Sequence, residues 1–160
     1  MKAITALSAN TRRTLGAVLV ALVLMVVGAI FIEGFGAAFS IRSMLVLASL
    51  IAVASIGQTL VVLLGGIDLS IPFVIGFANV VTAALYGEGI DFWLVCLIAA
   101  ALSLAIGALN GALSSLLNLH PLIVTLGVGT TVQGVVLLWT GGLPTGSAPD
   151  YLSEFVSAVR

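Results

Sequence analysis

The stretch Gly65-Gly66-Ile67-Asp68-Leu69-Ser70-Ile71-Pro72 is a polar, helix-breaking interruption between two long apolar runs. No charged residue occurs from Ser43 to Ile67 or from Leu69 to Gly87, so Asp68 is a lone carboxylate in apolar sequence. Even lenient insertion scales assign a mid-membrane Asp a cost of about 2.5–3.5 kcal/mol, which makes such a residue a candidate functional site. The glycines and the proline predict irregular backbone, which persists at membrane depth only where protein covers it or a wet cavity adjoins it.

The composition of the chain is that of a polytopic membrane protein. Hydrophobic residues make up 61% of the sequence and charged residues 7%, with a mean hydropathy of +1.34. In soluble domains, about 25% of the residues are charged. The formal net charge of -1 gives no reason to expect nucleic acid or an anionic partner. Membrane lipid is therefore the first partner that the sequence predicts.

Asp68 also has a purely structural interpretation. Its carboxylate can cap the start of the following helix, with Ser70 assisting. Capping is compatible with a role along a polar path through the membrane, and the sequence leaves both open. A proton relay needs several titratable groups in a chain. Because Asp68 stands alone, we predict that it orders the break or a gate and does not carry protons.

The residue counts argue against an enzyme. Cys96 and His120 are the only cysteine and histidine, which leaves no disulfide framework and disfavours metal or acyl-transfer chemistry. Lys2 is the only lysine, so the chain has no glycine-rich phosphate loop ending in Lys-Ser or Lys-Thr. We therefore predict no catalytic residue, no metal site and no cofactor. For His120, which precedes Pro121, a solvated or carbonyl-bonded loop position is favoured over a proton relay.

Apolar runs predict an all-α bundle of about five transmembrane helices with a broken-helix segment near 65–72. The run from Thr14 to Ile32 has 19 uncharged residues, which is about enough to cross a bilayer core of roughly 30 Å. The predicted segments are a cytoplasmic N-terminal stretch at 1–13, spans at 14–32, 43–64, 71–86, 92–113 and 122–139, a loop at 33–42, and an extracytoplasmic loop with a short amphipathic helix at 140–160.

The orientation rests on three basic residues. Lys2, Arg12 and Arg13 precede the first apolar run, so the positive-inside rule places the N-terminus in the cytoplasm. A cleaved signal peptide is the alternative, but its apolar region is typically about 7–15 residues long, shorter than this run. At the other end, Asp150 is the predicted N-cap of an amphipathic helix. The apolar positions of that helix are Leu152, Phe155, Val156 and Val159.

Polar residues recur along the predicted spans. A polar face on a membrane helix usually contacts a neighbouring helix and only sometimes adjoins a solute path. Ser55, Gln58 and Thr59 share one helical face, because positions three and four apart are neighbours on a helix. The candidates for a translocation path or gate are Gln58, Asp68, Asn79, Thr82, Thr125 and Gln133, and the helix-break residues are Gly65, Gly66, Ser70 and Pro72.

The predicted span 92–113 carries small residues at every fourth position. Such a stripe lets two helix backbones approach closely, so we interpret this helix as the packing spine of the bundle. The predicted packing residues are Ala99, Ser103, Gly107, Gly111 and Ser115. Asn110, beside the stripe, is interpreted as an interhelical hydrogen-bond partner. Phe92 and Trp93 are expected to anchor one end of the span at the membrane interface.

Four segments carry a resemblance to a known family. They are Gly57-Gln58-Thr59-Leu60-Val61-Val62-Leu63-Leu64-Gly65-Gly66-Ile67-Asp68-Leu69-Ser70, Leu109-Asn110-Gly111, His120-Pro121-Leu122-Ile123-Val124-Thr125-Leu126-Gly127, and Leu138-Trp139-Thr140-Gly141-Gly142. In this order and spacing they resemble permease subunits of bacterial ABC importers for ribose and related monosaccharides. The resemblance implies an inner-membrane subunit that pairs with a second permease subunit. It also implies a cytoplasmic ATP-binding subunit, which alone binds ATP, and a periplasmic sugar-binding protein that delivers solute.

The sequence departs from that family in two respects. Permeases of the family are about twice as long, and their later half carries the cytoplasmic loop that engages the ATPase. We therefore expect the chain to correspond to the N-terminal half, either as half of a split subunit or as a truncated form. Pro72 stands where many relatives have a small residue followed by glycine. A secondary transporter, with coupling-ion ligands, and a non-transporting membrane scaffold remain as alternatives.

Overall fold

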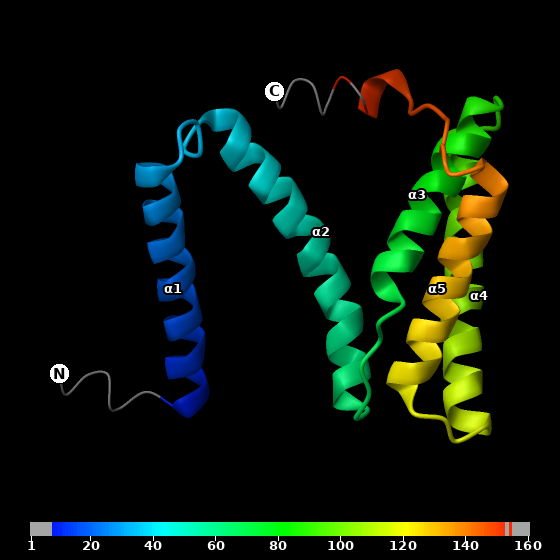
Figure 1. The fold of residues 1–160 in the computed structure, drawn as a ribbon, viewed down its shortest axis with the longest axis horizontal. Coiled ribbons are helices and arrows are strands. Elements are labelled where there is room, and N and C mark those ends of the chain that lie inside the picture. The colour runs from blue at the N-terminus through cyan, green and yellow to red at the C-terminus, as the bar shows by residue number, and fades with distance from the viewer. Residues whose placement is uncertain (1–7, 153, 155–160) are drawn as a thin grey trace. The chain divides into compact units, whose positions relative to one another are not determined.

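The computed structural model describes residues 8–152 and 154, and the regular structure in that part of the chain is α-helical (Figure 1). The helices are α1 (Ala9–Phe31), α2 (Ala38–Leu63), α3 (Ile71–Gly87), α4 (Phe92–Leu116) and α5 (Pro121–Thr140). Four of them are long and apolar enough to cross a membrane, and α3 is a shorter apolar helix of 17 residues. The predicted polytopic helix bundle with a break between the second and third helices is confirmed.

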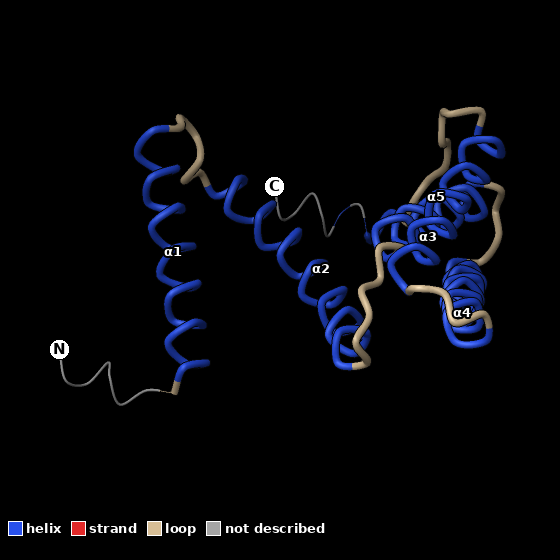
Figure 2. The backbone as a smooth tube through the Cα atoms, turned by 60° about the horizontal axis from the view of Figure 1, so that its bottom comes forward, coloured by secondary structure: helices blue, strands red, loops and turns tan. Residues whose placement is uncertain are grey.

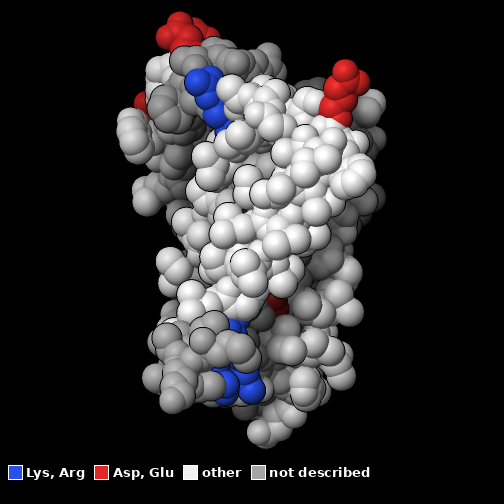
Figure 3. Space-filling view, turned by 90° about the vertical axis from the view of Figure 1, so that its left-hand side faces the viewer, with Lys and Arg blue, Asp and Glu red and all other residues white. Residues whose placement is uncertain are grey.

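The chain divides into two compact units within α2, after Ala48. In the first unit, the Ser8 hydroxyl caps α1 by accepting the amide of Thr11 at 3.2 Å. A turn at residues 32–37 joins α1 to α2, with Gly34 at a φ of +77°. The Phe35 ring lies so close to Gly28 that a methyl group added there would be 2.7 Å from it. The charged residues of α1, Arg12 and Arg13, lie near its start, and the face shown in Figure 3 is uncharged over its middle.

The connection between the first two helices is shorter than predicted. Residues 33–42 were expected to form a loop, but α2 already begins at Ala38 and so contains Arg42. The expected boundary followed the last charged residue, whereas a helix can continue past the bilayer core with an arginine whose apolar stem lies along it. Similarly, α1 begins before residue 14, and α4 continues to Leu116.

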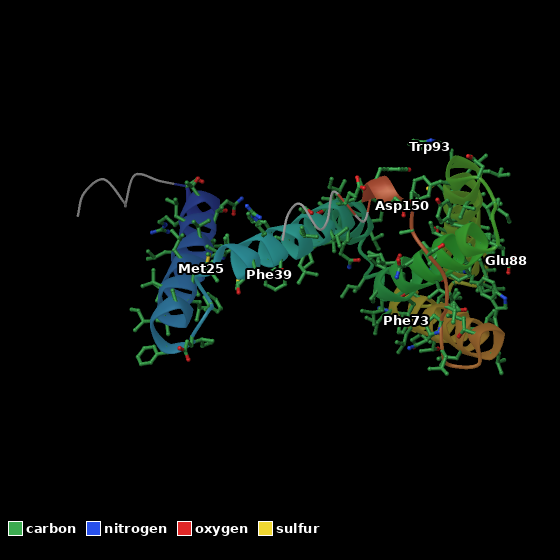
Figure 4. The ribbon with its side chains drawn as sticks, turned by 90° about the horizontal axis from the view of Figure 1, so that it is seen from above. Met25, Phe39, Phe73, Glu88, Trp93 and Asp150 are labelled. Atoms are coloured by element: carbon green, nitrogen blue, oxygen red, sulfur yellow. The ribbon has the colours of Figure 1, made fainter. Side chains whose placement is uncertain are left out.

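The core of the second unit is formed by α3, α4 and α5, which pack against one another (Figure 2). The apolar side chains buried there are Val81, Val95, Ala99 and Val124. At the crossing of α3 and α5, the Phe73 ring lies directly against Gly129, and any larger residue at that position would collide with it (Figure 4). A buried glycine thus lets these two helices approach closely.

A segment after α5 folds back onto the end of the bundle. Gly141 ends α5 in the left-handed conformation, and Gly146 then lies directly against the backbone of Ala83. The Ser147 amide donates to the Ala83 carbonyl at 3.1 Å. Phe92 stands edge-on to both Tyr86 and Tyr151, with ring centroids 6.0 and 6.1 Å apart. Desolvation raises the pKa of the Tyr151 phenol, and the neighbouring Tyr86 adds to the shift.

The predicted cap of the last helical segment requires a correction. Asp150 is already helical, and the Leu152 amide donates to the carbonyl of Pro149 at 3.0 Å. The helical turn therefore begins one residue earlier than expected, with Pro149 in the N-cap position where Asp150 was expected. Phe155, Val156 and Val159, the other apolar positions of the predicted amphipathic helix, lie outside the described residues, as do Lys2 and the rest of segment 1–7.

Candidate functional site

The helix break begins with two glycines that end α2. Gly65 adopts a φ of +82°, a conformation that favours glycine. Its amide donates to the Val62 carbonyl at 3.0 Å, and the Gly66 amide donates to the Val61 carbonyl at 3.0 Å. This pair of bonds is the Schellman arrangement that satisfies the last carbonyls of a helix. Gly66 is buried, and an added Cβ would lie 3.3 Å from Pro121 at the start of α5.

Asp68 orders the turn that leads into α3. One oxygen of its carboxylate, Oδ1, accepts the Ser70 amide at 2.7 Å and the Ser70 hydroxyl at 2.6 Å. Ser70 is the N-cap residue of α3, and its own side chain makes no capping bond to the helix. The carboxylate therefore holds the residue before the helix in place and does not bind the amides of the first turn, as a conventional cap would.

Two neighbouring helices hold the break by hydrogen bonds. The Asn110 side-chain amide on α4 donates to the Ser70 hydroxyl at 2.8 Å, which extends the chain of bonds to Asp68. On α5, the Thr125 hydroxyl accepts the Leu69 amide at 2.9 Å. Ser70, Asn110 and Thr125 are 2%, 5% and 4% exposed. We call Asp68, Leu69, Ser70, Asn110 and Thr125 the break cluster.

The break cluster lies inside the bundle, away from the neighbouring ends of α4 and α5. Thr125 is four residues into α5 and Asn110 is six residues before the end of α4. At 1.5 Å per residue, these positions are about 6 and 9 Å from the respective helix ends. Gly66, by contrast, contacts the first residue of α5. The chain therefore enters at the helix ends and runs inward along α4 and α5 before α3 begins.

Asp68 adjoins two cavities. The first, of about 420 Å³, lies between α2 and the start of α3, and its polar lining residues are Ser55, Gln58 and Asp68. The second, of about 230 Å³, lies between the end of α2, the break, α4 and α5. Its lining residues include Asp68, Asn110 and Thr125, together with Gly107 and Gly111. We call these the α2 cavity and the α4–α5 cavity; neither has a Lys, Arg or His among its lining residues.

Each cavity contains an amide oxygen without a hydrogen-bond donor. In the described part of the chain, Gln58 Oε1 at the α2 cavity and Asn110 Oδ1 at the α4–α5 cavity are buried and unpaired. A buried polar atom left without a partner costs roughly 1–3 kcal/mol. Such atoms in a native structure therefore require an explanation, for example a partner molecule that occupies the adjoining space.

The other polar residues singled out in the sequence do not join this cluster. Asn79 on α3 and Gln133 on α5 are exposed. The Thr82 hydroxyl donates to the Ala78 carbonyl of its own helix at 2.7 Å. Ser55 and Thr59 likewise donate to carbonyls of α2, at 2.7 and 2.6 Å. Of the predicted path residues, the structure places Gln58 with Asp68 at the α2 cavity and Thr125 with Asp68 at the α4–α5 cavity.

The small-residue stripe on α4 has two different surroundings. Ala99 is buried in the bundle, and the Ser103 hydroxyl donates to the Ala99 carbonyl at 2.7 Å. Gly107 and Gly111 have open space where a side chain would be, and Ser115 is exposed. The first part of the stripe therefore serves packing within this chain, while its two glycines leave room for the α4–α5 cavity.

Sequence reasoning missed the connection between Asn110 and the break. Asn110 was expected to be an interhelical hydrogen-bond partner, and its amide does join α4 to the start of α3, through Ser70, the N-cap residue 40 positions earlier. The signal was the coincidence of an amide beside a small-residue stripe with a Ser two residues after Asp. His120, expected in a loop, is exposed and accepts the Leu122 amide at 3.3 Å as the N-cap of α5.

Comparison with known proteins places these features in a family. The family described as branched-chain amino acid transport system / permease component matches residues 40–156. The D-allose transport system permease protein of Escherichia coli is 29% identical over 143 residues, covering 88% of this chain. The fructose import permease protein of Bifidobacterium longum is 42% identical over 86 residues, and covers 54% of it. The galactofuranose transporter permease protein of E. coli is 38% identical over 108 residues, and covers 67% of it.

The matched regions are a minor part of these relatives. They cover 44% of the D-allose permease protein, 24% of the fructose permease protein and 31% of the galactofuranose permease protein. The chain therefore spans less than half the length of these curated relatives. No solved structure matches the chain.

Proposed function

Because the chain belongs to the family of branched-chain amino acid transport system permease components, we propose that it acts as the transmembrane permease subunit of an ATP-driven importer. The cargo is a monosaccharide or a similarly small neutral solute. The family consists of transport permeases and not of enzymes, and the matched relatives are named for D-allose, fructose and galactofuranose. The chain itself is a multi-pass membrane protein.

The position of Asp68 beside both cavities carries this proposal. A neutral sugar leaves water only where hydrogen-bond partners replace those that it loses. The carboxylate of Asp68 and the unpaired oxygen of Gln58 can accept bonds from sugar hydroxyls at the α2 cavity. Solute crosses by alternating access, and the interrupted helix at Gly65, Gly66, Ser70 and Pro72 provides the element that moves.

The lining of the cavities favours a neutral solute over an amino acid. The family description mentions branched-chain amino acids, whose carboxylate groups require a cationic or amide-rich site. The residues that line the α2 and α4–α5 cavities include no cation, and their one charged group is the carboxylate of Asp68. The ammonium group of an amino acid could pair with Asp68, but its carboxylate would find no cationic partner there, whereas sugar hydroxyl groups need only hydrogen-bond partners.

The proposed assembly has four kinds of partner. A cytoplasmic subunit binds and hydrolyses ATP, a second permease subunit completes the path, a periplasmic sugar-binding protein delivers solute, and lipid surrounds the helices. The location is the bacterial inner membrane, with the N-terminus in the cytoplasm. These assignments are supported by the relatives, which are named as transport and import permeases, and by the basic residues that precede the first apolar run.

Copurification followed by uptake tests the proposal. The chain is isolated in mild detergent from its native membrane, and the complex is reconstituted in vesicles loaded with ATP. We expect an ATP-binding subunit to be retained and labelled monosaccharide to enter only when ATP is hydrolysed. Uptake driven by a proton or sodium gradient without ATP would identify a secondary transporter instead. Uptake of branched-chain amino acids, or no flux of any solute, would equally contradict the proposal.

A further inference from the structure

Around the α4–α5 cavity, the donors of Leu69 and Ser70 are used, the Ser114 hydroxyl lines the cavity as a further donor, and side-chain acceptors remain. The Leu69 amide is bound to Thr125, and the amide and hydroxyl of Ser70 are bound to Asp68 Oδ1. On the acceptor side, Asn110 Oδ1 has no partner although the residue is only 5% exposed. The second carboxylate oxygen of Asp68 has no bond among the described contacts that would use it. The lining therefore has unpaired acceptors and no basic side chain.

The backbone of the break adds further oxygens. Pro72 has no amide hydrogen, so the carbonyl of Asp68 cannot receive the bond that a helix would provide four residues later. Among the described backbone bonds, none reaches the carbonyl of Gly66 or of Asp68. Both residues line the α4–α5 cavity. Unwound carbonyls next to the C-terminal end of a helix, as here after α2, are a recurrent source of ligands for monovalent cations in membrane proteins.

Charge balance points the same way. Asp68 is half-buried between apolar helices, and the described part of the chain shows no ion pair to it. Neither cavity beside it is lined by a basic residue. One cation of charge +1 would make the site neutral, whereas a divalent ion would leave an excess charge in a medium of low polarity. The described residues also contain no cluster of three or more His, Cys, Asp or Glu that would suit a divalent metal.

We propose that the α4–α5 cavity binds one monovalent cation, of the sodium type, between the Asp68 carboxylate and Asn110 Oδ1. Carbonyl oxygens of the break and water complete its coordination, as suits a hard cation. The ion is a resident part of the structure: it joins the break to α4 and neutralises Asp68. Its binding is separate from solute transport, so it goes beyond the function proposed above.

The thermal stability of the purified chain in detergent micelles tests this site without solute, ATP or partner subunits. NaCl is titrated against choline chloride at constant ionic strength, and unfolding is followed by circular dichroism. A ligand that binds only the folded state raises the melting temperature in a saturable way. We expect Na⁺ to raise it and choline to leave it unchanged. Equal effects of the two salts, or no effect of either, would overturn the proposal.

Variants separate the ion from the hydrogen bonds around it. Asp68→Asn keeps the size of the side chain and removes its charge, so the apparent affinity for Na⁺ should fall at least roughly tenfold. Ser70→Ala lowers stability in any salt, but it removes no proposed ligand and should keep the Na⁺ response. Gln133→Ala, at an exposed site on α5, should behave as the unmodified chain. An undiminished Na⁺ response in Asp68→Asn would contradict the assignment.

Direct binding provides a second measurement in case Asp68→Asn does not fold. Radioactive sodium bound to the unmodified chain is counted in a scintillation proximity assay. We expect one saturable site that unlabelled Na⁺ competes for and choline does not. The absence of saturable binding to the unmodified chain would refute the site, whatever the outcome for sugar uptake.

Discussion

The break cluster and the polar residues on the faces of α3 and α5 obtain their hydrogen-bond partners in different ways. In the break cluster, Ser70, Asn110 and Thr125 are almost fully buried and bind across three segments of the chain. On the helix faces, Asn79 and Gln133 are exposed. The same residue types are thus structural in one region, while in the other they are open to solute, lipid or another subunit.

This difference shows what a polar residue in an apolar helix contributes. A buried polar group with partners from distant segments fixes one arrangement of the backbone, and its removal leaves those partners unsatisfied. A polar group on an exposed face contributes little to the folded state of its own chain. Substitutions in the break cluster should therefore lower the free energy of unfolding more than substitutions on the exposed faces. Substitutions on the exposed faces should instead affect transport or assembly while the fold is retained.

The largest loss of stability is expected for Asn110→Leu. The substitution removes the amide group that donates to the Ser70 hydroxyl. This hydroxyl in turn donates to Asp68, so the chain of bonds loses its first member. We expect the free energy of unfolding in detergent to fall by about 2–3 kcal/mol, near the upper end for a buried group that loses its partner. Gln133→Leu, a similar change at an exposed site, is the matched control. Equal losses in both variants would remove the distinction between the regions.

A smaller loss is expected for Gly65→Ala. Gly65 ends α2 at a φ of +82°, and an L-residue with a Cβ is less favourable in that conformation by roughly 1–2 kcal/mol. Gly76→Ala is the control, since Gly76 lies within α3 with nothing within 4 Å of an added Cβ. Alanine should stabilise that position by about 0.5–1 kcal/mol. Unfolding of both variants is compared, and the same sign of change in both would contradict the described break.

Thr125→Val should cost about 1 kcal/mol. Valine has nearly the same shape as threonine, but the Leu69 amide loses its acceptor. The control is Thr131→Val, because the Thr131 hydroxyl is exposed and donates only to a carbonyl of its own helix, at 2.8 Å. Hydrogen exchange of the Leu69 amide gives a local readout. Unchanged protection of that amide in Thr125→Val would show that the bond does not hold the break.

The smallest effects on stability are expected for Asn79→Ala and Gln133→Ala. Both side chains are exposed, so the free energy of unfolding should change by less than about 0.5 kcal/mol. If these residues adjoin the solute path or a partner subunit, sugar uptake or complex assembly should fall several-fold while the fold is retained. A stable variant with full uptake and full assembly would place the residue against lipid.

The sequence was sufficient for the helices but not for their connections. Long apolar runs predicted five helices, and the Gly-Gly and Pro signals around Asp68 predicted the break, because both depend on local chemistry. The start of α2 and the cap at Asp150 were displaced, since charge and capping residues locate a helix end only to within a few positions. The small-residue stripe on α4 was visible in the sequence. Which of its residues pack against a helix and which adjoin the α4–α5 cavity depends on where the other helices lie.

The candidate site could be predicted only in part for the same reason. Asp68 stood out because a lone carboxylate in an apolar chain is costly. That Asn110 binds Ser70, 40 positions away, depends on how α4 packs against α3. The unpaired oxygens of Gln58 and Asn110 are visible only when all neighbours are in place. The depth of the break was likewise set by contacts with Asn110 and Thr125 and not by local sequence.

The depth of the break in the membrane tests the account most directly. In a Cys96→Ser background, a spin label is attached at Ile67→Cys. The same label at Glu88→Cys is the reference in water. Collisions of each label with oxygen and with a water-soluble nickel complex are measured in lipid nanodiscs. Ile67 is 45% exposed and can carry the label. We expect the label at position 67 to report a depth below the headgroups, with oxygen collisions well above those at position 88. Collisions at position 67 equal to those at position 88 would place the break in bulk water and contradict it.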